Sequence, residues 1–379
     1  MLQKTVRDFS RDTIEPVASQ IDRDGEMPDD LISKMARLKL LGMTVPEKYG
    51  GTEAGNLSCV LACEQLGYTG TGVWWIVGFN NSISECIARY GSDKLKEKYL
   101  RPACEGVAYC SIQFTEANTG SDAEALTTTA LPEHADYVIN GAKRFSTFGA
   151  RDGHAILYAR DETGNCSAFV VEKNTKGYKA EKRWDLMGGG GIETVDVYLE
   201  NMRVPKENLL GKKGEGFAIL LSWIAAEKVQ QCGASVGIAQ AALDEAVKYT
   251  KQRIVKNRPL SNMQGIRWSL SEMKSNIEAA RWLTYRAAFL QDRNDPNWMA
   301  EAAAAKLFVT PATMDAVNQA IRIHGGYGYT RDFKIERLYR AIAGVPMIAV
   351  SLEINKSIVG ASLVEDENYT EGTPGITAL

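Results

Sequence analysis

The sequence predicts an α+β protein in which three domains follow one another: a helical N-terminal domain (1–112), a central β-barrel-like domain (113–215) and a C-terminal four-helix bundle (216–379). Two changes of pattern lead to this prediction. Apolar residues recur at helical spacing towards both ends of the chain, whereas the middle contains short runs rich in β-branched and aromatic residues. With 379 residues the chain is long enough for two or three domains.

The N-terminal part is expected to be helical. Segment 29–43 has apolar residues at helical spacing after an Asp-rich start that could cap a helix. Paired glycines at 50 and 51 indicate a loop, and the helical spacing returns in 81–106. The adjacent Trp74 and Trp75 could line a ligand pocket. As neighbours in a helix, they are more simply interpreted as one core residue and one half-exposed residue.

The central part changes to the pattern of short strands. Turn residues separate the runs at intervals typical of strands, which predicts a compact β domain. The expected strands are 136–147, 153–160, 166–173, 177–184 and 194–205.

The C-terminal part returns to long helical segments. Segment 217–253 is long enough for about ten helical turns, and 270–292, 300–323 and 333–342 follow after short connections. Long helices with short connections predict an antiparallel bundle. A cleft where the three domains meet is the default place for a ligand.

Composition excludes several classes of function. A formal net charge of −3 argues against a nucleic-acid binder, because no basic excess is present to neutralise phosphates. The first residues contain no apolar signal-peptide region, and no run of about 18 apolar residues could span a membrane. Seven Cys and three His form no CxxC pair and no zinc spacing, so buried, reduced thiols in a soluble, cytoplasmic protein are expected and no metal site is predicted.

Four motifs resemble those of one enzyme family, the acyl-CoA dehydrogenases. The run TEANTGSD (115–122) is similar to the family's TEPGAGSD, and NGAKRFST (140–147) to NGxKxWIT. VPKENLLGKKGEGF (204–217) closely matches VPxxNxLGxxGxGF. GGYGYT (325–330), followed by Tyr339 and Arg340, resembles GGxGYxxxxxxxRxxRD. Each motif alone is weak, but four in the right order with matching spacing cover nearly the whole chain.

The resemblance implies FAD bound between the β domain and the bundle, usually in a homotetramer, and an acyl thioester as substrate. In the family a base removes the α-proton while the β-hydrogen leaves as hydride to flavin N5. Elementary chemistry agrees with these requirements. The base must be a carboxylate whose pKa is raised by a dry pocket, and no protein side chain accepts hydride.

The resemblance also implies individual cofactor contacts. Without it, these residues would be interpreted as a glycine turn, as strand packing and as a helix C-cap. Phe145 stands where the family usually has Trp, and Arg322 where it has Gln. The implied contacts are Phe114, Thr115, Gly120, Ser121, Phe145, Thr147, Arg253, Arg322, Gly325, Gly326, Ser351 and Glu353.

The catalytic base is where the chain departs from most of the family. The usual Glu lies nine residues after the arginine matched by Arg340, which is Ala349 here. A minority of the family, including isovaleryl-CoA and long-chain acyl-CoA dehydrogenases, places Glu on the first bundle helix, ten residues before a glycine matched by Gly237. That position is Glu227. The resemblance therefore implies Glu227 as the base, although the local pattern alone favours a solvated Glu–Lys pair.

Three positions are expected to contact substrate: Ser121, Lys228 and Ala349. Lys228 replaces a common Arg, which exchanges a bidentate donor for a point charge. Segment 186–194 lacks an Arg and a Ser that often lie near the pantetheine arm, so recognition of CoA is less secure than binding of FAD.

Several functions remain open. The acyl group could be carried by CoA or, as with prolyl groups in some relatives, by an acyl-carrier protein, and it could be short or unusual. Electrons could pass to an electron-transfer flavoprotein or to oxygen. A flavoprotein that performs an elimination or serves only as a binding subunit is a further alternative. An interaction scaffold would not explain four flavin-site motifs in order.

Overall fold

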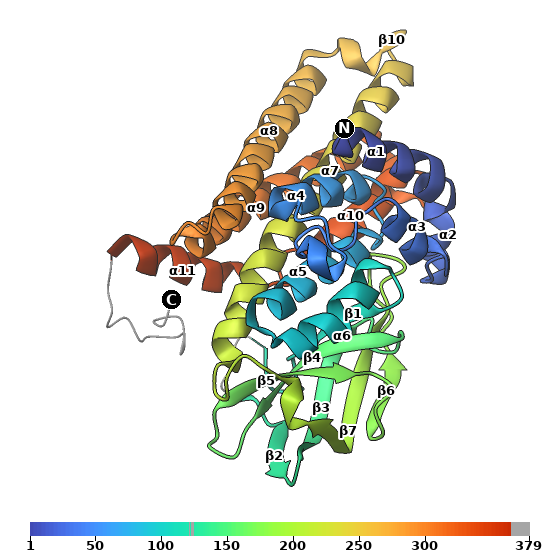
Figure 1. Cartoon of the computed structure of the whole chain (residues 1–379). Helices are drawn as coiled ribbons and strands as arrows, with labels where there is room; N and C mark the ends of the chain where they lie inside the picture. The colour runs from blue at the N-terminus through green and yellow to red at the C-terminus, as the bar shows by residue number, and fades with distance from the viewer. Residues whose placement is uncertain (121, 123–124, 365–379) are drawn as a thin grey trace.

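A computed structural model describes residues 1–120, 122 and 125–364. The β domain lies at one end of the molecule, at the bottom in Figure 1, and the long helices extend away from it. Helical N-terminal and C-terminal domains and a sheet between them in sequence confirm the predicted α+β class. No helix in the described part of the chain is long and apolar enough to cross a membrane.

The N-terminal domain packs its helices along the middle of the bundle. Ser92 caps the last of them, since its hydroxyl accepts a hydrogen bond from the Leu95 backbone N–H at 3.3 Å. The helices are α1 (Leu2–Phe9), α2 (Ala18–Asp24), α3 (Leu31–Arg37), α4 (Gly55–Gly67), α5 (Trp74–Tyr90) and α6 (Asp93–Cys104).

The β domain is one sheet in the order β6-β7-β3-β2-β4-β5-β8, with β1 added parallel to β4. β2 meets β4 only at Thr129 and Arg160, so two halves join along a narrow seam. The strands are β1 (Tyr109–Gln113), β2 (Thr129–Glu133), β3 (Asp136–Thr147), β4 (Gly153–Arg160), β5 (Cys166–Glu172), β6 (Tyr178–Arg183), β7 (Thr194–Pro205) and β8 (Leu209–Leu210). β1 corrects the expectation that residues up to 112 are helical.

The C-terminal domain is built around α7. Its helices are α7 (Gly216–Gln252), α8 (Gln264–Asp292), α9 (Trp298–His324), α10 (Lys334–Ala343) and α11 (Leu352–Val364). A small hairpin, β9 (Ile254–Val255) and β10 (Arg258–Pro259), joins α7 to α8.

Small residues let α4 cross α7 closely. A Cβ on Gly237 would come within 1.9 Å of the Glu64 carbonyl oxygen, and one on Gly67 within 2.3 Å of the Ala234 carbonyl oxygen. At the N-terminal end of α7, the Phe217 ring meets Phe114 of the β domain with centroids 6.3 Å apart. The base predicted on α7 therefore lies between the β domain and the crossing with α4. All seven cysteines are free and buried, as the sequence predicts.

Candidate active site

Glu227 lies on the face of α7 that packs against α5. One turn before it, Trp223 donates its indole N–H to the Ser82 hydroxyl of α5 at 3.1 Å. One turn after it, the Gln230 amide oxygen lies 3.4 Å from the place where Gly78 of α5 would carry a Cβ. Because residues three and four apart share one face of a helix, the Glu227 side chain points into the same interface.

The Glu227 carboxylate is buried without a hydrogen-bond partner. Its residue is 1% exposed, and neither carboxylate oxygen has a partner in the described part of the chain. Burial raises the pKa of Glu227 to about 7, although the positive charges of Lys306 and Lys228 oppose the shift. A carboxylate with a pKa near neutrality can both take up and release a proton at working pH.

Lys306 of α9 connects Glu227 to the segment that carries the base in most of the family. It is fully buried, and its ammonium donates to the backbone carbonyls of Ile348, of Ala349 at 3.3 Å and of Val350 at 2.9 Å. Ala349 and Val350 have φ of 50° and 64°. This left-handed conformation is strained, most of all for the β-branched Val350. One lysine therefore acts on the Glu227 carboxylate through its charge and holds the segment of Ala349 through hydrogen bonds.

Lys228 lies beside Glu227 and is also removed from solvent. It is 1% exposed, and burial together with the neighbouring Lys306 lowers its pKa to about 7, against the influence of Cys232 and Glu227. With a pKa of about 7, Lys228 is only partly protonated at neutral pH. Its place next to Glu227 keeps it a candidate for substrate contact.

Aromatic side chains form the wall next to Glu227. Trp74 and Trp75 stack with centroids 4.3 Å apart and are 5% and 6% exposed, so the expectation of one half-exposed Trp is wrong. Phe79 meets Trp75 edge-on at 4.8 Å and Trp223 at 5.7 Å. The second Trp is buried because α5 is covered by α7 as well as by its own domain.

The β domain carries a second group of predicted residues. Phe114 is buried, Thr115 and Thr147 are partly buried and Gly120 is exposed, with no atom within 4 Å of where its Cβ would be. Ser121 lies outside the described residues. Phe145 is 53% exposed with φ of 53°, and its ring lies 4.9 Å from that of Trp184. An exposed aromatic side chain in a strained backbone conformation suits a flat ligand.

A buried ion pair holds the segment that contains Gly120. The Glu116 carboxylate accepts hydrogen bonds from the Lys143 ammonium at 2.7 Å, from the Thr127 N–H at 2.7 Å and from the Thr128 hydroxyl at 2.6 Å. Both ends of the loop are thus joined at one carboxylate. The sequence contained this pair inside two of its motifs, but nothing in the motifs indicated that the two residues meet.

A third group lies at the far end of α7. Gly325 and Gly326 have no atom within 4 Å of where a Cβ would be, and with Arg253 they line a hollow of about 500 Å³. Exposed Arg322 lies one helical turn before them on α9. From Phe217 to Arg253, α7 advances by about 54 Å at 1.5 Å per residue. One chain therefore cannot place this group and the β-domain group on the same dinucleotide.

Ser351 and Glu353 lie where α11 begins. The Ser351 hydroxyl accepts the Ile354 N–H at 3.4 Å, and its carbonyl accepts the Asn355 amide at 2.7 Å. Ser351 follows directly on the strained Val350, whereas the Glu353 side chain is exposed. Ser351 therefore lies next to residues 348–350, which Lys306 binds, whereas the Glu353 side chain points to solvent.

The altered segment 186–194 packs too tightly for the missing arginine. A Cβ on Gly190, where that Arg would stand, would come within 2.4 Å of the Asp22 Cα. Arg340 pairs with Asp22 at 2.5 Å and donates to the Met187 carbonyl at 3.3 Å. The loss of the arginine is therefore accompanied by docking of this loop onto α2 and α10.

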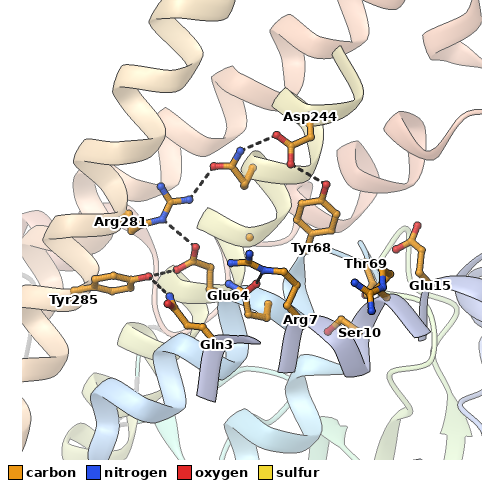
Figure 2. A pocket seen from close by; sticks show the side chains of 14 residues that line it. Gln3, Arg7, Ser10, Glu15, Glu64, Tyr68, Thr69, Asp244, Arg281 and Tyr285 are labelled. Atoms are coloured by element: carbon orange, nitrogen blue, oxygen red, sulfur yellow. Dashed lines mark hydrogen bonds and ion pairs between the residues drawn. The ribbon is translucent and has the colours of Figure 1, made fainter. Parts of the chain in front are cut away.

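Figure 2 shows a larger pocket of about 650 Å³ between α1, α4, α7 and α8. Most of its polar side chains have partners, although the Ser10 hydroxyl has none among the described residues. Glu64 binds Arg281 at 3.0 Å and the Tyr285 hydroxyl at 2.5 Å, and Tyr68 donates to Asp244 at 2.8 Å. Because these groups already have partners, the pocket is not the catalytic centre. No cluster of His, Cys, Asp or Glu suited to a metal occurs among the described residues.

The fold and the buried carboxylate beside an aromatic wall agree with an oxidoreductase that acts on a CH–CH bond with a bound flavin, which is the class that the family comparison gives. Models of the acyl-CoA dehydrogenase N-terminal, middle and C-terminal domains match residues 1–107, 111–202 and 214–364. The chain belongs to the acyl-CoA dehydrogenase family. FAD is the cofactor of this family, and the open glycines at 120, 325 and 326 fit the close approach of such a ligand.

Three relatives illustrate the range of the family. An acyl-CoA dehydrogenase of Bacillus subtilis is 37% identical over 369 residues, which cover 96% of this chain and 97% of the relative. A 3-(aryl)acrylate reductase of Clostridium sporogenes is 34% identical over 370 residues, covering 96% and 98%. The structure of butyryl-CoA dehydrogenase from Megasphaera elsdenii superposes with a TM-score of 0.93 at 32% identity, covering 96% of this chain and 97% of the other.

Proposed function

We propose that this enzyme interconverts an acyl thioester and its α,β-unsaturated form, with Glu227 as the group that moves the α-proton. The observation that carries the proposal is the burial of Glu227 with no hydrogen-bond partner in the described part of the chain, and this burial raises its pKa to about 7. A structural carboxylate at this depth would be paired. The empty position at Ala349 supports the same assignment, because no other carboxylate replaces the usual base.

The residues around Glu227 have distinct tasks. Glu227 takes the α-proton in the direction of oxidation and returns it in the direction of reduction. Lys306 stabilises the carboxylate form and fixes the segment of Ala349. Trp74, Phe79 and Trp223 exclude water from the base, which keeps its pKa high. FAD, when bound, supplies the hydride acceptor or donor.

The flavin would be held by the β domain, with Phe114, Thr115, Gly120, Phe145 and Thr147 as the contacts. The proposed contacts at Ser351 and Glu353 lie in the C-terminal domain, at the start of α11. Phe145 offers an exposed ring that could cover the flavin. Ser121, proposed for both FAD and substrate, completes the same loop in sequence.

The far group, Arg253, Arg322, Gly325 and Gly326, would contact the FAD of a second copy. The length of α7 supports this arrangement, because one FAD is too short to contact both the β-domain residues and the far group of the same chain. Trp268, Trp282 and Phe289 of α8 are 60%, 67% and 51% exposed at spacings of 14 and 7 residues, which places them on one helix face. We propose that this face is covered in a homotetramer.

The oligomer is tested by Trp282→Glu. We expect light scattering to show a smaller particle and the FAD content to fall, because the far group would no longer reach the cofactor. A variant that remains a tetramer, or that becomes a monomer with full FAD, would contradict a composite site.

The carrier of the acyl group and the electron acceptor can be separated by one set of titrations. CoA thioesters and the same acyl groups on a carrier protein are added anaerobically to the oxidised enzyme, and enoyl thioesters to the reduced enzyme, while flavin absorbance is followed. Reaction with CoA thioesters supports the family's usual substrate. Reaction only with carrier-protein thioesters supports the alternative favoured by the altered segment 186–194. If neither class reacts in either direction, an elimination or binding role replaces the proposed dehydrogenation.

The acceptor follows from turnover. We expect an electron-transfer flavoprotein to reoxidise the enzyme much faster than oxygen does. The opposite order would identify an oxidase.

A further inference from the structure

Two glutamines next to Glu227 have no hydrogen-bond partners. Gln230 and Gln231 are both 0% exposed, and neither the oxygen nor the nitrogen of either amide has a partner among the described residues. Nearby polar groups behave differently: the Trp223 indole is paired with Ser82, and Lys306 is paired with backbone carbonyls. The unpaired atoms therefore concentrate at the face of α7 that carries the base.

The two amides lie one helical turn beyond Glu227. Residues three and four positions after Glu227 share its face, at an axial separation of roughly 5 Å. The Gln230 oxygen faces Gly78, and a Cβ at that glycine would also lie 3.4 Å from a ring carbon of Trp74. The missing side chain at Gly78 leaves the amide unobstructed beside the aromatic wall. The amides thus belong to the interface into which the acyl chain must enter if Glu227 meets its α-carbon.

An unpaired buried amide is costly. A buried donor or acceptor without a partner destabilises a protein by about 1–3 kcal/mol, whereas Leu has a similar size and would fill the same volume without that cost. A ligand that supplies the hydrogen-bond partners would remove this cost for both glutamines. An apolar acyl chain would leave all four polar atoms unsatisfied.

We propose that Gln230 and Gln231 bind an uncharged hydrogen-bonding group of the acyl chain, a hydroxyl or a carboxamide, placed roughly four bonds beyond the α-carbon. This inference rests on the proposed function, because it takes Glu227 as the marker of the α-carbon. An uncharged group both donates and accepts, as the two amides do. A carboxylate would only accept, and it would bring a second negative charge close to Glu227.

Three thioesters of equal chain length test the proposal: pentanoyl-CoA, 5-hydroxypentanoyl-CoA and glutaryl-CoA, with the matching carrier-protein thioesters if CoA is not accepted. The wild-type FAD enzyme should use the hydroxyacyl thioester at least about tenfold better in kcat/KM than the pentanoyl thioester, as for one hydrogen bond. Gln230→Leu with Gln231→Leu should reverse this preference. Gln240→Leu, a matched substitution further along α7, should leave the ratio of the two unchanged.

The outcomes separate this inference from the proposed function. An active wild-type enzyme that prefers pentanoyl-CoA, or whose preference survives in the double variant, would overturn the role of the amides and leave Glu227 as the base. Preference for glutaryl-CoA would overturn the uncharged group. If no thioester reacts in either direction, the proposed function itself fails.

Unfolding of the substrate-free holoenzyme gives a readout independent of activity. If the amides wait for a ligand, Gln231→Leu should raise the unfolding temperature, and 5-hydroxypentanoyl-CoA should stabilise the wild type more than this variant. A lower unfolding temperature in the variant would show that the amide is already bonded within the protein, which would contradict the proposal.

Discussion

Two buried glutamates next to lysines show how differently one fold treats the same pair of residue types. Glu116 in the β domain is 6% exposed and is surrounded by donors from Lys143, Thr127 and Thr128. Glu227 in the bundle is 1% exposed and has no such donor among the described residues. Burial alone would raise the pKa of Glu116, but the charge and the hydrogen bond of Lys143 lower this pKa to about 2. In Glu227 burial prevails, and the pKa rises to about 7.

The difference lies in what the lysine does. The Lys143 ammonium gives a hydrogen bond directly to its carboxylate, so the pair is closed. Lys306 gives its hydrogen bonds to backbone carbonyls and acts on Glu227 only through its charge. A satisfied carboxylate organises structure, and an unsatisfied one remains available for chemistry.

The largest effect is expected for Glu227→Gln. Removing the base should slow flavin reduction by the substrate at least about a hundredfold while FAD stays bound. Anaerobic stopped-flow absorbance measures the rate, with Glu97→Gln, at an exposed position of α6, as the control. Adding Ala349→Glu to the inactive variant should restore part of the rate, because Lys306 serves both positions. Reduction of flavin at the wild-type rate by Glu227→Gln would show that the base is another group.

Removing one partner of the Glu116–Lys143 ion pair should instead lower the stability of the protein. Lys143→Met leaves the Glu116 charge buried without its counter-ion, which is expected to lower the free energy of unfolding by about 3–5 kcal/mol. Urea unfolding measures it. Lys179→Met, which removes a solvent-exposed pair with Glu200, is the matched control and should cost far less stability. Equal losses would mean that the Glu116 pair is no more important than a surface pair.

The two glutamates should respond to pH in opposite directions. The pKa of Glu116 lies below its usual 4.5, so its contribution to stability is present above pH 4.5 and is lost as the pH falls towards 2. The pKa of Glu227 lies above 4.5, so its contribution is complete below pH 4.5 and is lost as the pH rises through 7. At pH 8, Glu116→Gln should therefore destabilise the enzyme and Glu227→Gln stabilise it, each by about 1–3 kcal/mol.

Denaturant unfolding of both variants at pH 4 and pH 8 checks this contrast. The gain of Glu227→Gln should shrink at pH 4, where the wild-type carboxyl is already protonated. A loss of stability in both variants at pH 8 would indicate that Glu227 has a partner after all.

A smaller effect is expected for Lys306→Gln. The Lys306 charge lowers the pKa of Glu227, so its removal should raise the apparent pKa of flavin reduction from about 7 by roughly one unit. Because the reaction needs the carboxylate, the wild-type rate should increase as the pH rises through 7, and the variant should need a higher pH. A lower rate with an unchanged pH profile would assign Lys306 a purely structural role at residues 348–350.

The sequence predicted the fold well where pattern and topology agree. The expected strands 136–147 and 194–205 coincide with β3 and β7, which are long and rich in β-branched and aromatic residues. Short β1 was missed because five residues carry too little pattern to separate a strand from an adjoining helix. Helix α11 was not predicted as an element, and its mixture of apolar and small residues shows no strong face.

The site could be predicted only in part, because motifs give order without distance. They led to the proposal of Glu227 as the base, but they did not indicate that Lys306 and residues 348–350 meet, about 80 to 120 positions later in the chain. A lysine within an alanine-rich helix has the pattern of a surface residue, although Lys306 is fully buried. The motifs also placed Arg253 and Thr147 at one cofactor, and the length of α7 separates them.

The most direct test of the central claim is a crystal structure of the enzyme with FAD and a thioester that cannot react. We expect a Glu227 carboxylate oxygen within about 3–3.5 Å of the substrate α-carbon, as in a reactive geometry. A different carboxylate at that distance, with Glu227 turned away from the substrate, would contradict it.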